Sequence, residues 1–285
     1  MQTRRDLVKL ALGALGTSRL LTAKPNSVVR GVIIGAQSYS FRDRSIDEAI
    51  AAMSKAGISY CELWQGHIEP QQATRKGLRE WRENIAIEHF DVAREKFDKA
   101  GIKLYAYNYS FQDDFSDREI ERGFEMAEAL GVKYITASAN VSVSGRVNAY
   151  AAKKEMFVGM HNHDSMKPNE FSTPDDFARA MLGNSNIRVN LDIGHFTAAG
   201  FDPVNYLDKY ADFIVTLHLK DRKKNHGENL PFGQGDTPIR EVLQTLAAKK
   251  LKIPAMIEYE YSGGDAVEEV RRCFEFCRDA VKARG

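Results

Sequence analysis

From residue 31 onward, short apolar runs alternate eight times with longer amphipathic segments. The runs typical of buried strands cover residues 32–36, 60–64, 103–107, 134–138, 157–161, 188–192, 213–219 and 253–259. The segments with helical periodicity cover residues 46–56, 79–100, 117–130, 147–154, 174–182, 203–210, 238–249 and 266–282. Eight strand–helix units in about 250 residues are what a closed (β/α)8 barrel requires.

The prediction is therefore an α/β protein, a single (β/α)8 TIM barrel over residues 31–283. The competing architecture is a doubly wound open sheet, which commonly carries a glycine-rich phosphate-binding turn after its first strand. Here that position reads Gly35-Ala36-Gln37-Ser38, which is no such turn. The three cysteines are an odd number, which argues against a disulfide framework, and we expect them to be packing residues.

The charge balance limits the class of partner. The chain of 285 residues has 40 lysines and arginines and 39 aspartates and glutamates, a formal net charge of +1. Such a balance provides no basic field for a phosphate backbone, so we expect no nucleic-acid partner. A small-molecule substrate is the better expectation.

The first 23 residues differ from the rest of the chain. Arg4 and Arg5 stand in a twin-arginine pattern, and residues 10–21 form a mostly apolar stretch that is too short to span a bilayer. We therefore predict that residues 1–23 are a twin-arginine-type signal peptide, and that the protein is periplasmic or otherwise extracytoplasmic without a stable membrane anchor. The alternative is a frayed amphipathic N-terminus, since Arg19 interrupts the apolar stretch.

Metal-binding residue types gather at the predicted carboxyl ends of the strands, where barrels of this kind place their active sites. The candidates are Glu62 and His67, the run His161-Asn162-His163-Asp164, Asp192 with His195, His218, and Glu258. His161, Asp192, His218 and Glu258 come from four consecutive strands and could converge on one ion. Imidazole together with carboxylate suits Mn²⁺, Fe²⁺, Co²⁺ or Zn²⁺.

Several motifs resemble the xylose isomerase-like TIM-barrel superfamily of sugar phosphate isomerases and epimerases. They are Leu191-Asp192-Ile193-Gly194-His195, His218-Leu219-Lys220-Asp221, Gly233-Gln234-Gly235-Asp236 and Ile257-Glu258. The resemblance implies a divalent ion, often Mn²⁺, held by Glu, Asp, His and Glu. Asp192, His218 and Glu258 match that set. His161 stands where many members have a glutamate that is both ligand and base.

The resemblance implies a metal-dependent sugar isomerase or epimerase acting through a metal-stabilised enediolate, with a small-molecule carbohydrate as substrate. We expect Glu258 to be the base, although Glu260 could be the ligand in its place. His195, His163 and Lys220 are candidates for proton transfer. Glu62, His67, His195 and Tyr107 are candidates for substrate binding, and Tyr107 could instead belong to the core.

Because His161 removes one carboxylate, isomerisation, dehydration or β-elimination gains weight over two-base epimerisation. The alternatives are an exported dehydratase or β-eliminating lyase of 3-keto-glycosides, and a non-catalytic relative that binds metal or sugar. An apurinic endonuclease-like enzyme would need three metals and a basic surface. The sequence is compatible with a homo-oligomer.

Overall fold

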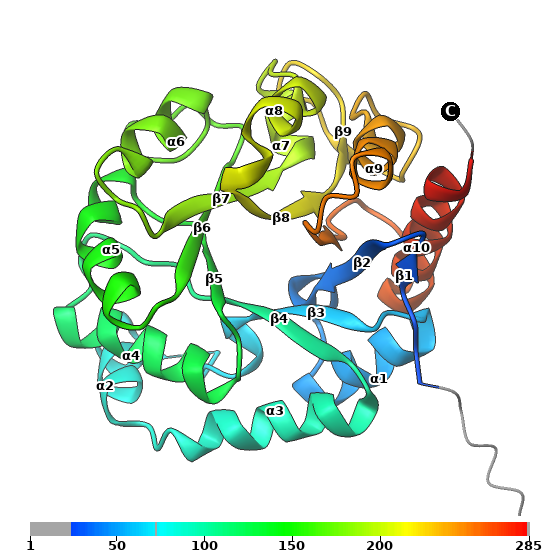
Figure 1. The fold of residues 1–285 in the computed structure, drawn as a ribbon. Helices are drawn as coiled ribbons and strands as arrows, with labels where there is room; N and C mark the ends of the chain where they lie inside the picture. The colour runs from blue at the N-terminus through cyan, green and yellow to red at the C-terminus, as the bar shows by residue number, and fades with distance from the viewer. Residues whose placement is uncertain (1–23, 72, 284–285) are drawn as a thin grey trace, which may run out of the picture.

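The computed structural model describes residues 24–71 and 73–283, in which eight parallel strands close into a barrel (Figure 1). The strands are β2 (Val32–Gln37), β3 (Tyr60–Trp64), β4 (Lys103–Asn108), β5 (Tyr134–Ala137), β6 (Phe157–His161), β7 (Ile187–Asp192), β8 (Ile214–Leu219) and β11 (Ala255–Ile257). Each strand pairs with the next one in this order, and β11 pairs back with β2 to close the ring. The predicted (β/α)8 barrel is confirmed.

Helices surround the barrel and separate the strands along the chain (Figure 1). They are α1 (Ile46–Ala56), α2 (Arg75–Asn84), α3 (Glu88–Ala100), α4 (Asp117–Ala129), α5 (Ser144–Lys153), α6 (Pro174–Met181), α7 (Ile193–Ala198), α8 (Pro203–Tyr210), α9 (Ile239–Ala248) and α10 (Ala266–Lys282). Ser45, Ser116 and Thr173 begin α1, α4 and α6 with complete capping boxes, in which side chain and backbone satisfy each other's free N–H groups.

One predicted helix was wrong. Residues 79–100 are not continuous, because the backbone of Ile85 is extended and ends α2 before α3 begins at Glu88. Three features were not predicted. They are the antiparallel pairing of β1 (Val28–Val29) with β2, the short helix α7, and a small hairpin of β9 (Asp221–Arg222) and β10 (Asn229–Leu230).

A buried ionic network ties α2 to α4. The carboxylate of Glu119 on α4 is completely buried and accepts hydrogen bonds from Arg75 Nη1 at 2.8 Å and Arg79 Nε at 3.0 Å. Arg82, which is also buried, lies 3.5 Å from Glu119 and donates to Glu69 Oε1 at 2.7 Å. These pairs compensate the cost of burying the charges, so they hold the two helices in one arrangement.

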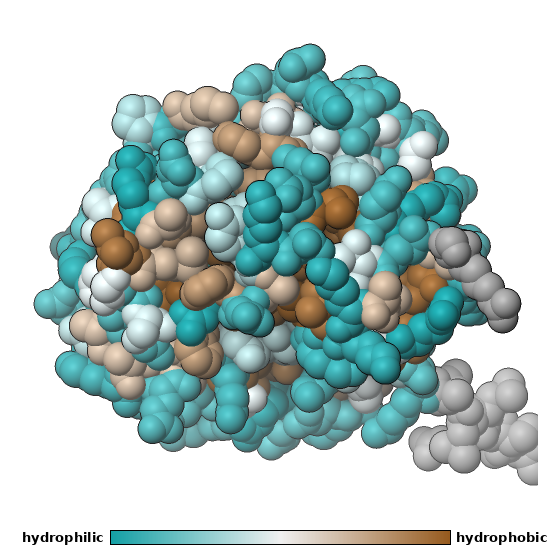
Figure 2. All heavy atoms as spheres, turned by 45° about the horizontal axis from the view of Figure 1, so that its top comes forward, coloured by the Kyte–Doolittle hydropathy of each residue, from teal (hydrophilic) through white to brown (hydrophobic). Residues whose placement is uncertain are grey.

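The surface seen in Figure 2 is mostly hydrophilic, with hydrophobic residues in small separate patches. Cys61, Cys273 and Cys277 are buried and form no disulfide, as expected for packing residues. Within the described residues, every helix is too short or too polar to cross a lipid bilayer. The predicted signal peptide of residues 1–23 lies outside the described residues and stays a prediction.

Candidate metal centre

A cavity of about 310 Å³ opens at the carboxyl ends of the barrel strands. Its volume is at the lower end of the range that small-molecule sites occupy, roughly 300–1,000 Å³. It is lined by Gln37, Tyr39, Trp64, Asn108, Ser110, Ser138, His161, His163, His195, His218, Lys220, Glu258 and Glu260. A larger cavity of about 740 Å³ lies at the opposite end of the barrel, beside Arg30, Lys250 and Lys252. The first cavity is the candidate site, because it lies at the end where barrels carry their chemistry.

The structure brings the four predicted ligands together. His161, Asp192, His218 and Glu258 stand at or directly after the ends of β6, β7, β8 and β11, and all four are buried. One ligand atom from each lies within 4.8 Å of the others. The set offers two imidazole nitrogens and two carboxylate oxygens, which suits a transition-metal ion or Zn²⁺.

Two of these four residues carry buried polar atoms that lack a hydrogen-bond partner, which supports the fit to a cation. They are Nδ1 of His161 and Oδ2 of Asp192; the latter forms an ion pair with Lys220 at 3.2 Å without hydrogen-bond geometry. Burial, followed by the neighbouring His218, lowers the pKa of His161 well below its usual value, so this imidazole is neutral and can offer a lone pair. An unpaired buried acceptor is costly unless an ion or a donor satisfies it.

The Asp192-Ile193-Gly194-His195 motif has a clear local cause. Asp192 is the N-cap of α7, and its Oδ1 accepts the backbone N–H of His195 at 2.7 Å. This bond occupies one carboxylate oxygen and leaves Oδ2 facing Lys220 at 3.2 Å. The spacing therefore orients the carboxylate and starts the helix that carries His195.

Two carboxylates hold His218 from opposite sides. Its Nε2 lies 2.9 Å from Glu62 Oε1, and its Nδ1 lies 3.0 Å from Glu258 Oε2. Burial alone would lower the pKa of His218, but Glu62 and Glu258 raise it well above its usual value. Since Glu62 takes Nε2, Nδ1 is the atom that faces the other candidate ligands. A carboxylate behind a ligand histidine is a common way to fix the ring.

A buried lysine lies among the carboxylates. Lys220 Nζ is 3.2 Å from Asp192 Oδ2, 3.0 Å from Glu258 Oε2 and 2.6 Å from Glu260 Oε2. Burial alone would lower the pKa of Lys220, but these three acids raise it. Burial would raise the pKa of Glu258, but Lys220 and then His218 hold it well below its usual range.

The structure also separates Glu258 from Glu260. Glu258 belongs to the four-residue group, whereas Glu260 lines the same cavity and contacts Lys220. Among the described residues, the geometry therefore favours Glu258 as the ligand.

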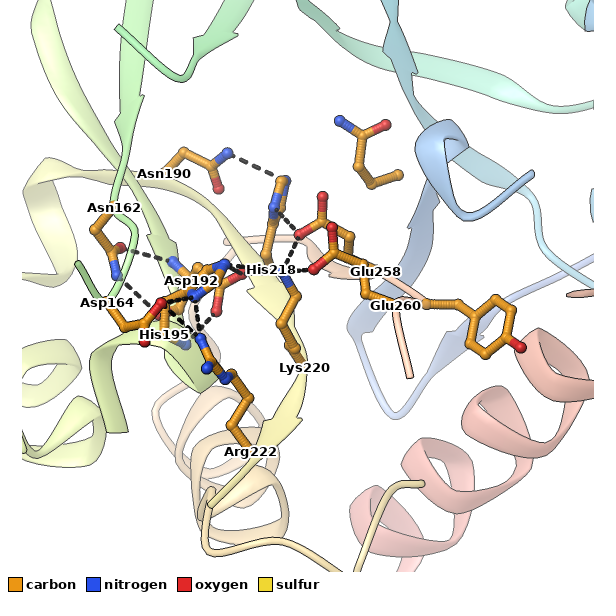
Figure 3. A network of polar contacts seen from close by, with 12 residues as sticks. Asn162, Asp164, Asn190, Asp192, His195, His218, Lys220, Arg222, Glu258 and Glu260 are labelled. Atoms are coloured by element: carbon orange, nitrogen blue, oxygen red, sulfur yellow. Dashed lines mark hydrogen bonds and ion pairs between the residues drawn. The ribbon is translucent and has the colours of Figure 1, made fainter. Parts of the chain in front are cut away.

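His195 connects the cavity to a polar network at its edge (Figure 3). Its Nδ1 lies 3.1 Å from Asp164 Oδ1, and its Nε2 lies 3.1 Å from Lys220 Nζ. Arg222 Nη1 approaches the same Asp164 oxygen at 2.7 Å. Lys220 is a donor, so Nε2 of His195 accepts, whereas Nδ1 lies between an acceptor, Asp164, and a donor, Arg222 Nη1 at 2.7 Å. The hydrogen bond from His195, together with Arg222, lowers the pKa of Asp164 below its usual range.

His163 also lies in the cavity, between other imidazoles. Its ring centroid is 5.0 Å from that of His161 and 5.4 Å from that of His195. Burial, followed by His195 and Lys220, lowers its pKa. A neutral His163 can accept a proton at neutral pH, as the predicted proton-transfer role requires.

Three residues predicted to bind substrate lie outside the lining of the cavity. Glu62 is completely buried behind His218, where Thr136 and Gln37 also donate to its Oε1 at 2.6 Å and 3.2 Å. The ring of His67 is held by Ser38 Oγ at Nδ1 and by the carbonyl oxygen of Phe41 at Nε2.

Tyr107 is the third of these residues. It is completely buried and stacks on Tyr109, with its ring also against Phe90 of α3. It therefore belongs to the layer between barrel and helices, which is the core interpretation. The structure gives no support to the predictions that Glu62, His67 and Tyr107 contact substrate, whereas His195 does line the cavity.

The sequence analysis missed the neutral and aromatic part of the lining: Gln37, Tyr39, Trp64, Asn108, Ser110 and Ser138. Each stands at or just after the end of a predicted strand, so its position was a usable signal. Neutral and aromatic residue types also occur at strand ends for packing reasons, so residue type alone did not distinguish them from the core.

The last motif, Gly233-Gln234-Gly235-Asp236, has a structural cause. The carboxylate of Asp221 accepts backbone N–H groups from Gly233 at 2.7 Å, Gly235 at 3.0 Å and Thr237 at 3.2 Å. A Cβ at position 235 would overlap this carboxylate, so the loop needs glycine there. Asp221 thus orders a loop next to the site.

The fold and the site together define a (β/α)8 barrel with a candidate metal centre, and the comparison with known proteins identifies its family. Residues 50–280 match the model of the xylose isomerase-like TIM barrel family, so the chain belongs to that family. L-ribulose-5-phosphate 3-epimerase UlaE of Escherichia coli is 29% identical over 135 residues, 47% of this chain and 46% of that protein. The match thus spans about half the length of this curated relative.

Solved structures share the fold. The probable 3-DHS dehydratase AsbF of Bacillus anthracis superposes with a TM-score of 0.66 at 16% identity, over 88% of this chain and 99% of that one. The IOLI protein, whose crystal structure holds a zinc atom, superposes with a TM-score of 0.67 at 17% identity, over 88% and 98%. At these identities the superpositions show the fold that this chain shares with those proteins.

Proposed function

We propose that this protein is a metal-dependent enzyme of the sugar isomerase/epimerase type, which removes a proton from a carbon next to a carbonyl group. The observation that carries the proposal is the buried group of His161, Asp192, His218 and Glu258 beneath a polar cavity. These four residues would hold the ion, and Mn²⁺ is our first choice ahead of Zn²⁺, Co²⁺ and Fe²⁺. A bound divalent ion supplies Lewis-acid stabilisation for the negative charge that develops on the carbonyl oxygen.

The chain's own residues would move the proton. Glu258 has its pKa held low by Lys220 and His218, so it is ionised and can accept a proton. Lys220 keeps its proton in a buried position next to Glu258, and it could exchange one of its present contacts for a hydrogen bond to a substrate oxygen. His163 and His195 line the cavity and could return a proton from another direction.

A β-eliminating lyase or dehydratase is the second candidate, and His161 favours it. Two-base epimerisation needs a base on each face of one carbon, and a neutral, buried His161 replaces the carboxylate that would serve one face. An elimination needs one base and one acid. Glu258 and Lys220 lie 3.0 Å apart and could fill those two roles.

Incorporation of solvent deuterium tests the proposal. The metal-loaded protein is incubated in D2O with a panel of keto-sugars and 3-keto-glycosides, and exchange at carbon is followed by NMR. We expect metal-dependent deuterium uptake that Glu258→Gln abolishes, with Glu260→Gln as the matched control in the same cavity. An enone product would identify the lyase, and no exchange with any member of the panel would contradict the proposal.

We also propose that the protein acts outside the cytoplasm. The support is the twin-arginine pattern at Arg4 and Arg5, in the part of the chain that the structure does not describe. A fusion of residues 1–30 to a reporter that is active only after export would test it, with both arginines changed to lysine as the control.

A further inference from the structure

The cavity has two chemically different halves. Strands β6, β7, β8 and β11 contribute the histidines, Lys220 and the carboxylates. The adjacent strands β2, β3, β4 and β5 contribute only neutral groups: Gln37, Tyr39, Trp64, Asn108, Ser110 and Ser138. The first half holds the proposed chemistry, so the second is free to hold the part of the substrate that does not react.

The indole of Trp64 is fixed in the neutral half by contacts on several sides. The ring of Tyr39 meets it edge-on, with centroids 5.0 Å apart, and the ring of His67 meets it in the same way at 5.4 Å. A Cβ at position 66 would overlap the indole, so Gly66 lies directly against it.

The backbone next to Trp64 is tied to the same group. Trp64 N–H donates to Ser38 Oγ at 2.8 Å, and that hydroxyl in turn lies 2.9 Å from His67 Nδ1. An aromatic surface that is held in place before binding loses little conformational entropy when a ligand packs on it.

Hydrogen-bonding groups for hydroxyls surround the aromatic side chains. The side-chain N–H of Asn108 donates to Thr136 Oγ1 at 3.2 Å, which leaves the side-chain oxygen of Asn108 to accept from other donors. Ser110 and Ser138 line the same wall with small polar side chains. Neutral amides and hydroxyls beside an aromatic ring match a sugar, which presents C–H faces and hydroxyl edges.

Among the described residues that line the cavity, Lys220 is the one ammonium or guanidinium group, and carboxylates already compensate its charge. Lys220 contacts three carboxylates. Arg222 pairs with Asp164 and donates to the carbonyl oxygen of Gly227. Arg42 is exposed and does not line the cavity; it lies over the ring of Tyr39 and donates through Nη1 to the carbonyl oxygens of Tyr39 and Tyr259.

We propose that Trp64 is the platform on which the non-reacting part of an uncharged sugar or glycoside packs, and that the cavity discriminates against sugar phosphates. The inference rests on the proposed function, and it adds the substrate class. Three carboxylates, Asp192, Glu258 and Glu260, would balance Lys220 and a divalent ion, so no positive charge remains to attract a phosphate ester. This substrate class differs from that of the L-ribulose-5-phosphate epimerase to which the chain is similar.

Tryptophan fluorescence offers a direct test, because the chain has two tryptophans. The other one, Trp81, lies on α2 against His89 and Phe90. In Trp81→Phe, the emission reports on Trp64 alone. This variant, loaded with Mn²⁺, is titrated with D-glucose, D-fructose and methyl β-D-glucoside, and with glucose 6-phosphate and fructose 6-phosphate.

We expect saturable changes in emission with the neutral sugars and weaker binding of each phosphate ester than of its parent sugar. By calorimetry, Trp64→Leu should bind the neutral sugars about tenfold more weakly, whereas Trp81→Phe should bind them normally. Tighter binding of the esters, competition by inorganic phosphate, or no response to any neutral sugar would overturn the inference. These readouts need no turnover, so deuterium exchange without a Trp64 response would refute the platform alone, and binding without exchange would refute the proposed function alone.

Discussion

The contact between Glu62 and His218 gives a sharp test of the metal centre. Glu62 does not belong to the four candidate ligands, yet its Oε1 lies 2.9 Å from Nε2 of His218. Both side chains are buried, with 0% and 2% of their surface exposed, so water screens the contact little. Glu62→Gln keeps the size of the side chain and removes its charge.

The expected loss follows from the role of a carboxylate behind a ligand histidine. The carboxylate fixes the ring with its proton on Nε2 and makes Nδ1 a stronger donor toward the ion. Loss of such a partner typically weakens metal affinity about 10- to 100-fold, which corresponds to about 1.4–2.7 kcal/mol. A glutamine can still contact the ring, so we expect a weakened site that is not abolished.

Calorimetric titration with Mn²⁺ and Zn²⁺, after removal of bound metal, measures this loss. Thr136→Val is the matched control, because Thr136 Oγ1 donates to the same Glu62 oxygen at 2.6 Å without touching His218. Thermal unfolding of the metal-free proteins separates loss of fold from loss of affinity. A folded Glu62→Gln variant with unchanged affinity for both ions would refute the reasoning.

Three further predictions concern protons and stability. The pKa of His218 is raised in the metal-free protein, so Mn²⁺ binding near pH 7 should release a proton. The affinity for Mn²⁺ should therefore rise with pH until that pKa is passed. Calorimetry in buffers of different ionisation enthalpy counts the released protons. Asp164→Asn should shift Nδ1 of His195 toward a lone pair, because the acceptor at Asp164 is weakened while the donor Arg222 remains; ¹⁵N NMR of the imidazole reports this, and unchanged protonation of Nδ1 would contradict the role of Asp164. Glu119→Gln should cost about 1–3 kcal/mol in the free energy of unfolding, because the hydrogen bonds from Arg75 and Arg79 lose their charged acceptor, whereas Arg82 keeps Glu69. Burial would raise the pKa of Glu119, but Arg75 and then the backbone of Ser116 hold it below its usual value of about 4.3. This stabilisation is therefore present above that pH and is lost on further acidification, so denaturant unfolding between about pH 3 and 7 should show a flatter profile for the variant.

The barrel could be predicted from the sequence because its strands are buried on both sides. Such strands appear as short apolar runs, and β3, β6, α1 and α8 have the predicted bounds. The break between α2 and α3 was missed because Ile85 and Ile87 continue the apolar periodicity across it. Helix α7 was missed because its six residues are too few for a periodic pattern.

The grouping of the candidate ligands could also be predicted, since parallel strands carry their ends to one edge of the barrel. Which residues lie behind the candidate ligands and which line the cavity could not be predicted. Glu62 and Trp64 both belong to β3, yet Glu62 is buried behind His218 and Trp64 lines the cavity. His67 and Tyr107 hold or fill neighbouring structure, which residue type alone does not reveal.

His161, Asp192, His218 and Glu258 should together hold one divalent ion. Elemental analysis of the full chain, purified without chelator, measures this ion, with His161→Ala and His218→Ala beside the unchanged chain and Glu260→Gln as the control in the same cavity. We expect close to one transition-metal or zinc ion per chain, lost in both histidine variants and kept in Glu260→Gln. A chain that takes up no metal even after resupply, or histidine variants that keep a full complement, would contradict this expectation.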